Sequence, residues 1–158
     1  MTDRIKQEFW ERLEDTRVGM LTAGGARPVP MSHYVDEDSP SPTLWFITAQ
    51  GTDLAEAAVT GSDGRFIVCS TDGQLHARID GHLSLSTDRA ELERLWNGVA
   101  GAWFEGGRDD PDVRLLRFDL SEAEVWVTGG SLKFLYEIGR AHLTDSKPDI
   151  GDHALLRF

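Results

Sequence analysis

The sequence predicts an α+β fold in which six or seven antiparallel strands form a barrel or a strongly bent sheet, flanked by helices. Three observations lead to this prediction. Residues 74–86 alternate apolar and polar side chains over the length of a long strand. Short polar turns separate most of the other candidate strands, as expected for hairpins. Helical patterns occur near the start, the middle and the end of the chain, without the regular βαβ alternation of a parallel sheet.

The first elements are a helix and a hairpin. Over residues 3–14, apolar side chains recur every four residues, which predicts a helix. Residues 16–23 are typical of a buried strand, and the glycine pair that follows them predicts a hairpin turn. Residues 27–35 would form the return strand. Because Pro28 and Pro30 cannot donate to a strand ladder, we expect this strand at an edge or a bulge.

The middle of the chain predicts two strands joined by a short helix. Residues 43–48 are rich in β-branched and aromatic side chains, which favour a strand. Residues 54–59 predict the helix, and Asp53 with Glu56 has the spacing of a capping box. Residues 65–70 predict the next strand, which leads into the long strand over residues 74–86.

The last third of the chain predicts two more strands and a helix. Residues 113–120 and 123–128 are expected to pair around a turn at Ser121-Glu122. Ser131 is expected to cap the last helix. The tail from Thr144 onward is polar and predicts no further element.

Composition and charge exclude several classes of protein. At 158 residues, the chain is long enough for a full core, and we expect residues 1–158 to form one domain. A formal net charge of −11 argues against nucleic acid and anionic membranes as partners. No apolar run approaches the ~20 residues of a membrane span, and the first residues lack an apolar signal core. The single cysteine, Cys69, allows no internal disulfide, which fits the cytoplasm.

Most motifs of catalysis and metal binding are absent. The sequence contains no glycine-rich phosphate loop with lysine, no His-Glu-x-x-His, no Cys-x-x-Cys and no Gly-x-Ser-x-Gly. His76 and His82 share a strand face, but six residues at ~3.3 Å each place them roughly 20 Å apart. No metal site is therefore predicted. Cys69 follows Val68 in an apolar strand and is predicted to be a buried, inert thiol.

A candidate anion site lies at the turn over residues 48–53, where a strand leads through Gly51 into a helix. Main-chain N–H groups at the start of the helix, with the hydroxyls of Thr48 and Thr52, suit a phosphate. Ordinary helix capping explains the same residues, and Asp53 places negative charge where the anion would bind. Both interpretations remain open from the residues alone.

A series of short motifs spans most of the chain in a fixed order. The most specific of them runs from Ala102 through Trp103 to Asp112, and we interpret it as a structural turn rather than a cofactor contact. The others are Phe9-Trp10, Val18-Gly19-Met20-Leu21-Thr22, Pro30-Met31, Leu44-Trp45-Phe46-Ile47-Thr48, Arg78-Ile79-Asp80-Gly81, Leu95-Trp96, Leu115-Leu116-Arg117, Ala123-Glu124-Val125-Trp126 and Lys133-Phe134. In this order they resemble the FMN-binding split-barrel proteins related to pyridoxamine 5'-phosphate oxidase, specifically the general stress protein branch.

The resemblance implies a six- to seven-stranded antiparallel split β-barrel that pairs as a homodimer, with a flavin in each of two grooves between the subunits. It implies FMN as the cofactor, with FAD as the alternative. The strand from Arg27 to Tyr34 would follow the isoalloxazine ring and ribityl chain, and the segment from Phe46 to Thr52 would hold the phosphate. Trp126 and Lys133 would reach the flavin across the dimer. The implied cofactor-binding residues are Arg27, Val29, Pro30, Met31, His33, Phe46, Ile47, Thr48, Thr52, Arg78, Trp126 and Lys133.

Two departures from the family pattern concern the phosphate. The pattern usually has arginine where this chain has Val29, and lysine or arginine where it has Leu54. Charge-assisted hydrogen bonds contribute ~1.5–3 kcal/mol each, so losing two would weaken binding strongly unless other cations replace them. Arg27 would project to the same strand face as Val29; Arg78 and His33 are the other candidates. The alternative is a non-catalytic dimeric split barrel that has lost FMN or binds another cofactor, such as a deazaflavin or haem.

Catalysis is a separate question, because a flavin carries the hydride chemistry while the protein supplies orientation and electrostatics. The resemblance implies a flavin-dependent oxidoreductase or a flavin carrier linked to the stress response. The sequence shows no acid–base pair placed over a flavin and no cluster for a substrate phosphate. No catalytic residue is therefore assigned, and pyridoxamine 5'-phosphate oxidation itself is not expected.

Overall fold

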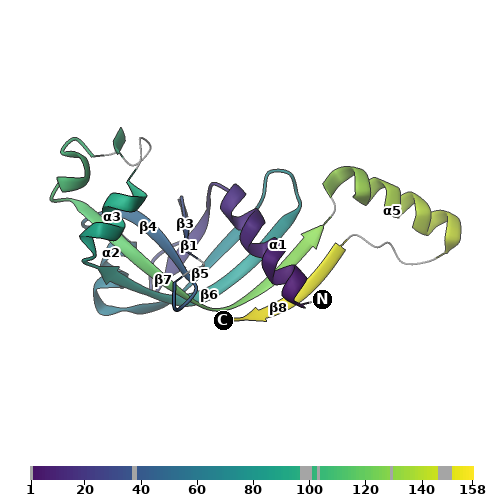
Figure 1. Ribbon diagram of the computed structural model, residues 1–158, viewed down its shortest axis with the longest axis horizontal. Coiled ribbons are helices and arrows are strands. Elements are labelled where there is room, and N and C mark those ends of the chain that lie inside the picture. Colours follow the sequence, from purple (N-terminus) through teal and green to yellow (C-terminus); the bar gives the residue numbers. More distant parts are fainter. Residues whose placement is uncertain (1, 37–38, 97–100, 103, 129, 146–150) are drawn as a thin grey trace.

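A single curled antiparallel sheet organises the protein, as the computed structural model shows (Figure 1). The structure describes residues 2–36, 39–96, 101–102, 104–128, 130–145 and 151–158. The strands are Gly19–Ala23 (β1), Val29–Met31 (β2), Tyr34–Asp36 (β3), Thr43–Ala49 (β4), Ser62–Cys69 (β5), Leu75–Ser86 (β6), Val113–Thr128 (β7) and Gly151–Arg157 (β8). The helices are Thr2–Asp15 (α1), Asp53–Thr60 (α2), Arg89–Leu95 (α3), Gly130–Thr144 (α5) and the short 3₁₀ helix Gly107–Asp109 (η1).

The order of the strands almost closes the sheet into a barrel. The strands pair in the order β2-β1-β5-β6-β7-β4-β3, and β8 adds to β7. The two ends of this order, β2 and β3, follow each other in the chain and are separated only by Ser32 and His33. The predicted α+β architecture, an antiparallel split barrel with flanking helices, is thereby confirmed.

The return strand predicted over residues 27–35 is instead two short strands on opposite edges of the sheet. Pro30 lies in the edge strand β2, where a missing N–H breaks no ladder bond, so its predicted edge position is confirmed. The break has a physical cause at His33. Its ring is buried, and its Nε2 lies 2.8 Å from the main-chain oxygen of Leu13 in α1. This anchor turns the chain away from β1 and towards β4.

The turn predicted at Ser121-Glu122 is a β-bulge inside one continuous 16-residue strand, β7. Asp80 pairs with Glu122 and Gly81 pairs with Leu120, so Ser121 is the extra residue, and its Oγ donates to the Asp80 oxygen at 3.0 Å. On either side of the bulge, the two halves of β7 pair with different strands at their second edge. Its first half pairs with β4 and its second half pairs with β8.

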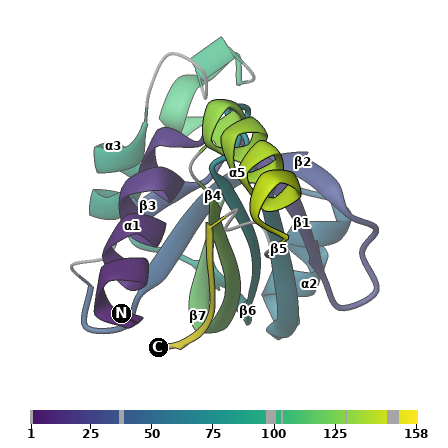
Figure 2. The same cartoon turned by 90° about the vertical axis from the view of Figure 1, so that its right-hand side faces the viewer.

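The core fills the inside of the curled sheet and is closed by α1, which lies across it (Figures 1 and 2). The four-residue spacing predicted for this helix is confirmed, because Ile5, Phe9 and Leu13 are all fully buried. From the strands, Phe46, Phe66 and Phe118 meet in edge-to-face contacts with ring centroids 5.1 and 6.3 Å apart.

The outer face of the sheet is covered only in part. Over β4 and the start of β7, α3 packs Leu92 and Leu95 against Trp45 and Leu115. Over β1, β5 and β8, apolar side chains remain exposed within the protomer, including Met20, Ile67 and Leu155. Cys69 also lies on this face and is exposed, so the buried thiol predicted from the sequence is wrong. Side chains alternate along β5, so that Phe66 and Val68 are buried while Ile67 and Cys69 are exposed.

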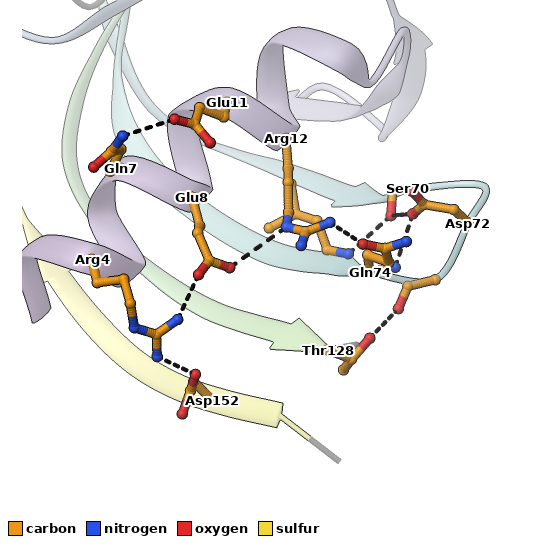
Figure 3. Close-up of polar contacts among 12 residues, drawn as sticks. Arg4, Gln7, Glu8, Glu11, Arg12, Ser70, Asp72, Gln74, Thr128 and Asp152 are labelled. Atoms are coloured by element: carbon orange, nitrogen blue, oxygen red, sulfur yellow. Dashed lines mark hydrogen bonds and ion pairs between the residues drawn. The ribbon is translucent and has the colours of Figure 1, made fainter. Parts of the chain in front are cut away.

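The tail beyond Thr144 contains a strand that the sequence did not predict. β8 pairs with the second half of β7, and among its described side chains only Leu156 is fully buried, so the apolar signal is weak. A chain of polar contacts ties β8 to α1 and to the turn between β5 and β6 (Figure 3). In it, Arg4 pairs with Asp152 and with Glu8, and Arg12 donates to Gln74.

Helix α5 is inserted between β7 and β8 and projects away from the barrel (Figure 1). In the part of the chain that the structure describes, neither α5 nor any other helix combines the length and the apolar character needed to cross a lipid bilayer.

Candidate functional site

An open seam of the barrel brings together two of the predicted site segments. β3 pairs with β4 only as far as Trp45, and β2 pairs by one edge with β1. Among the described residues, no strand covers the other edge of β2, and none covers that same edge of β4 from Phe46 to Ala49. Because β2 and β3 are nearly continuous in the chain, these two free edges border the same seam. The segments 27–33 and 46–52 therefore lie on its two sides.

On the β2 side of the seam, some of the predicted site residues are exposed and others are buried. Arg27, Val29 and Pro30 are exposed, whereas Met31 packs partly against the core. His33 is 8% exposed, and its ring lies edge-to-face on Phe66 with centroids 5.1 Å apart. Burial lowers the pKa of His33, although its hydrogen bond to the Leu13 oxygen opposes the shift. A neutral, buried imidazole is a poor replacement for a missing cation.

On the β4 side, two hydroxyls and the start of a helix come together. Thr48 Oγ1 lies 3.3 Å from Thr52 Oγ1. Thr52 caps α2, because its Oγ1 accepts the N–H of Ala55 at 3.2 Å; the predicted cap, Asp53, is instead the first residue of the helix. Gly51 makes this arrangement possible with a φ of 85°. The capping interpretation of this turn is thus confirmed, while the anion site stays a prediction.

Two other residues of this segment pack their side chains against apolar clusters, one fully and one in part. Phe46 is fully buried, so only its main chain can face the seam, while Ile47 packs partly against the cluster under α3. Leu54, which stands where the family pattern has a cation, is 3% exposed and belongs to the core. A charged side chain at position 54 would have to be accommodated in apolar surroundings. This explains locally why the chain carries leucine there.

A cation that the sequence did not predict for the site, Arg114, lies beside Thr48. The two residues are strand partners, and both belong to the rows of side chains that face the inside of the sheet. Arg114 Nη1 donates to the main-chain oxygens of Pro111 at 2.7 Å and Val113 at 2.9 Å. Within the described residues neither Arg114 nor Arg27 forms an ion pair. The alternation of β7 indicates the direction of Arg114, but only the register between strands reveals its neighbour.

Arg78 and Trp126 lie elsewhere, on the outer face of β6 and β7. Arg78 forms an ion pair with Glu124, whose other carboxylate oxygen lies 3.0 Å from His153 Nε2. The His153 ring stacks on Trp126, with centroids 5.0 Å apart and an interplanar angle of 14°. Trp126 is still 37% exposed. Lys133 belongs to α5, and its side chain is outside the described part of the structure.

Most of the predicted site residues, with the neighbours that the structure adds to them, form two groups on different parts of the protomer. Trp126 lies twelve residues beyond Arg114 on β7, and Arg114 is the partner of Thr48. At ~3.3 Å per residue, the strand between them measures at most about 40 Å, and the bulge and the curl of β7 make the direct distance shorter. We call the first group, residues 27–33 and 46–52 with Arg114, the seam group. The second, Arg78, Glu124, Trp126 and His153, is the outer-face group. Across the described residues, no cluster of three or more His, Cys, Asp or Glu side chains could hold a metal ion.

The most specific sequence motif, residues 102–112, borders the seam group at its end, where Arg114 donates to the Pro111 oxygen and the Gln50 N–H donates to the Asp112 oxygen. Asp110 accepts the N–H groups of Asp112 at 2.9 Å and Gly106 at 3.0 Å, and these hydrogen bonds lower the pKa of its carboxyl. Asp109 forms an ion pair with Arg89 at the start of α3. These contacts fit the structural turn predicted from the sequence. Trp103 lies outside the described residues.

The curled sheet, the nearly closed order of strands and the open seam define the protein as an antiparallel split barrel of the α+β class. A family model described as pyridoxamine 5'-phosphate oxidase like matches residues 4–149. The chain belongs to this pyridoxamine 5'-phosphate oxidase-like family, as its motifs predict.

Solved structures similar to this chain include three general stress proteins. One, assigned as general stress protein 26 from Jannaschia sp. CCS1, is 46% identical, with 100% of both chains covered and a TM-score of 0.88. The general stress FMN/FAD binding protein from Xanthomonas citri is 34% identical, covering 82% of this chain and 93% of its own, with a TM-score of 0.74. A general stress family protein from Xanthomonas campestris is also 34% identical, covering 83% and 92%, with a TM-score of 0.73. No curated protein matches the chain.

Proposed function

We propose that this protein is a cytoplasmic, homodimeric flavin-binding split barrel whose cofactor is FMN, and that it serves as a flavin-dependent oxidoreductase or a flavin carrier linked to stress. The observation that carries the proposal is the division of the predicted site into the seam group and the outer-face group. A second protomer can supply to each seam the indole that its own chain holds twelve residues further along β7, on the other face of the sheet. The similar protein from Xanthomonas citri is named as an FMN/FAD binding protein, which supports a flavin as the ligand.

The residues of the seam group suit the phosphate end of FMN. Thr48 and Thr52 offer hydroxyls, and the start of α2 offers main-chain N–H groups. Arg27 and Arg114 supply guanidinium groups without carboxylate partners among the described residues, and such groups are strong phosphate ligands. They can take over from the cations absent at Val29 and Leu54.

The outer face suits both the ring of the flavin and a second protomer. Trp126 offers an exposed aromatic plane for stacking. Met20, Ile67 and Leu155 lie in one row across β1, β5 and β8, with the Arg78–Glu124 ion pair between them. Exposed apolar rows of this kind are typical of protein interfaces. A bound flavin would supply the hydride chemistry, while these residues would bind and orient it.

The absorption spectrum of the purified full-length protein tests the proposal. We expect an FMN spectrum as purified, or quenching of FMN fluorescence when FMN is titrated into micromolar protein. FAD and riboflavin titrations determine which flavin is preferred. A colourless protein that leaves the fluorescence of all three unchanged would contradict flavin binding. A deazaflavin or haem spectrum would support the alternative cofactor, and reduction of the bound flavin by NADH or NADPH would separate an oxidoreductase from a carrier.

A further inference from the structure

The indole of Trp126 is supported by contacts from three strands, β6, β7 and β8. One face of the ring stacks on His153 at 5.0 Å and 14°, which is close to parallel. His153 comes from β8, the strand that the sequence did not predict. Since Trp126 remains 37% exposed, part of the indole is open to a ligand although the ring is supported from one side.

His153 is itself fixed by a carboxylate. Its Nε2 lies 3.0 Å from Glu124 Oε1, and the other carboxylate oxygen of Glu124 accepts from Arg78. Glu124 is paired across strands with Arg78 on one side and with Leu155 on the other. The result is a continuous series of contacts, Arg78 to Glu124 to His153 to Trp126, that crosses β6, β7 and β8 on one face of the sheet.

We propose that Glu124 and His153 are positioning residues for flavin binding, which orient Trp126 so that its open face stacks on the isoalloxazine ring. This inference rests on the proposed function. An aromatic side chain that is already fixed loses less conformational freedom when a flat ligand stacks on it, so pre-orientation raises affinity. Arg78 acts through Glu124 in this arrangement.

The test compares His153→Ala, His153→Phe and Glu124→Ala with the unmodified protein. His153 is exposed on β8, so its removal leaves the core intact. Arg157→Ala, which changes another exposed residue of the same strand, is the matched control. Two quantities are measured: the Kd for FMN by fluorescence quenching, and the near-ultraviolet circular dichroism of the flavin-free protein, in which Trp126→Phe identifies the band of Trp126.

We expect His153→Ala to weaken FMN binding by about threefold to tenfold, the range of a lost aromatic stacking contact. The Trp126 band should also decrease in the flavin-free protein. His153→Phe, which keeps the stacking without the hydrogen bond, should restore most of the affinity, and Glu124→Ala should fall between these two. Arg157→Ala should change neither quantity.

Two outcomes contradict the inference in different ways. If the unmodified protein binds FMN and His153→Ala binds it equally well with an unchanged Trp126 band, the positioning role is wrong and the proposed function stands. If the unmodified protein binds no flavin, the proposed function fails and this inference fails with it.

Discussion

Arg114 and Trp126 lie on the same strand, twelve residues apart, and belong to the seam group and the outer-face group of the candidate cofactor site. Arg114 faces the inside of the sheet and Trp126 its outer face, and up to about 40 Å of bent strand separates them, so we do not expect one flavin to touch both Trp126 and Thr48, the strand partner of Arg114, in one protomer. If both groups bind flavin, they would come from different protomers.

This relationship predicts complementation between two defective variants. Thr48→Val removes a hydroxyl without changing the strand, and Trp126→Ala removes the indole; each homodimer should bind FMN about fivefold to tenfold more weakly. Mixed dimers, purified through two different tags, contain one site with both residues intact. Titration with FMN should therefore show half of the sites at the affinity of the unmodified protein. Mixed dimers without any such site would indicate that the two residues do not share a site across the interface.

The buried imidazole of His33 predicts a dependence of stability on pH. Burial lowers its pKa in the folded protein below the ordinary 6.5, so on acidification the unfolded chain takes up a proton before the folded one does. The free energy of unfolding is therefore not reduced by His33 above pH 6.5. It falls as the pH drops from there towards the folded-state pKa of His33, by at most about 1.4 kcal/mol per pH unit.

Urea unfolding between pH 5 and 8 measures the contribution of His33. We expect His33→Gln to be less stable at neutral pH but to show a flatter pH dependence in the acid range. His142→Gln, at an exposed position of α5, is the control and should keep the slope of the unmodified protein. An unchanged slope in His33→Gln would assign the acid sensitivity to other groups.

Much of the fold follows from patterns that act over short distances. The alternation over residues 74–86 and the four-residue spacing of Ile5, Phe9 and Leu13 both report burial directly, and both predictions are confirmed. The predictions that failed depend on distant partners. The bulge at Ser121 forms because β7 pairs with the continuous strand β6 opposite it, and β8 forms by pairing with the second half of β7. In both cases the pairing partner is distant in the sequence, so the local pattern does not indicate it.

The candidate site divides in the same way. The hydroxyls of Thr48 and Thr52 are neighbours because one short turn joins them, and the residues alone indicate this. Arg114 and His153 join the site only through strand register, 66 residues from Thr48 and 27 residues from Trp126 in the chain. The sequence also suggested Arg78 and His33 as replacement cations. In the folded chain one is paired with Glu124 and the other is buried.

The close packing around Gly81 predicts that adding one methyl group there strongly destabilises the protein. A Cβ at this position would lie 2.4 Å from the Asp119 oxygen and 2.9 Å from the Phe118 ring, so the bulge would have to open. We expect Gly81→Ala to reduce the free energy of unfolding by about 3 kcal/mol, the upper part of the range for overpacking. Gly25→Ala is the control because nothing lies within 4 Å of its Cβ position. Equal urea midpoints for the two variants would show that the bulge adapts at little cost.

The apolar row on the outer face predicts where the second protomer binds. Ile67 lies in this row between Met20 and Arg78 and is 44% exposed, so Ile67→Asp would place a charge in the proposed interface. We expect this variant to shift towards monomer in light scattering coupled to size-exclusion chromatography. Its affinity for FMN should fall as the dimer is lost. Val59→Asp, at an even more exposed apolar position on α2, should remain dimeric. Dimers of Ile67→Asp with normal stability would place the interface on another surface.

The guanidinium groups of Arg27 and Arg114 predict a selective loss of affinity for the phosphate. Riboflavin shares the ring and ribityl chain of FMN but lacks its phosphate, so it serves as an internal reference. If these two cations replace those absent at Val29 and Leu54, Arg27→Gln and Arg114→Gln should each weaken FMN binding by about 10- to 150-fold, since a charge-assisted hydrogen bond contributes ~1.5–3 kcal/mol. Riboflavin binding should change little. The loss should also become smaller at high salt if part of it is long-range attraction.

Arg89→Gln, at the start of α3 and paired with Asp109, controls for the loss of one positive charge from a strongly acidic protein. Equal losses for FMN and riboflavin would mean that the two arginines support the shape of the seam and do not bind the phosphate.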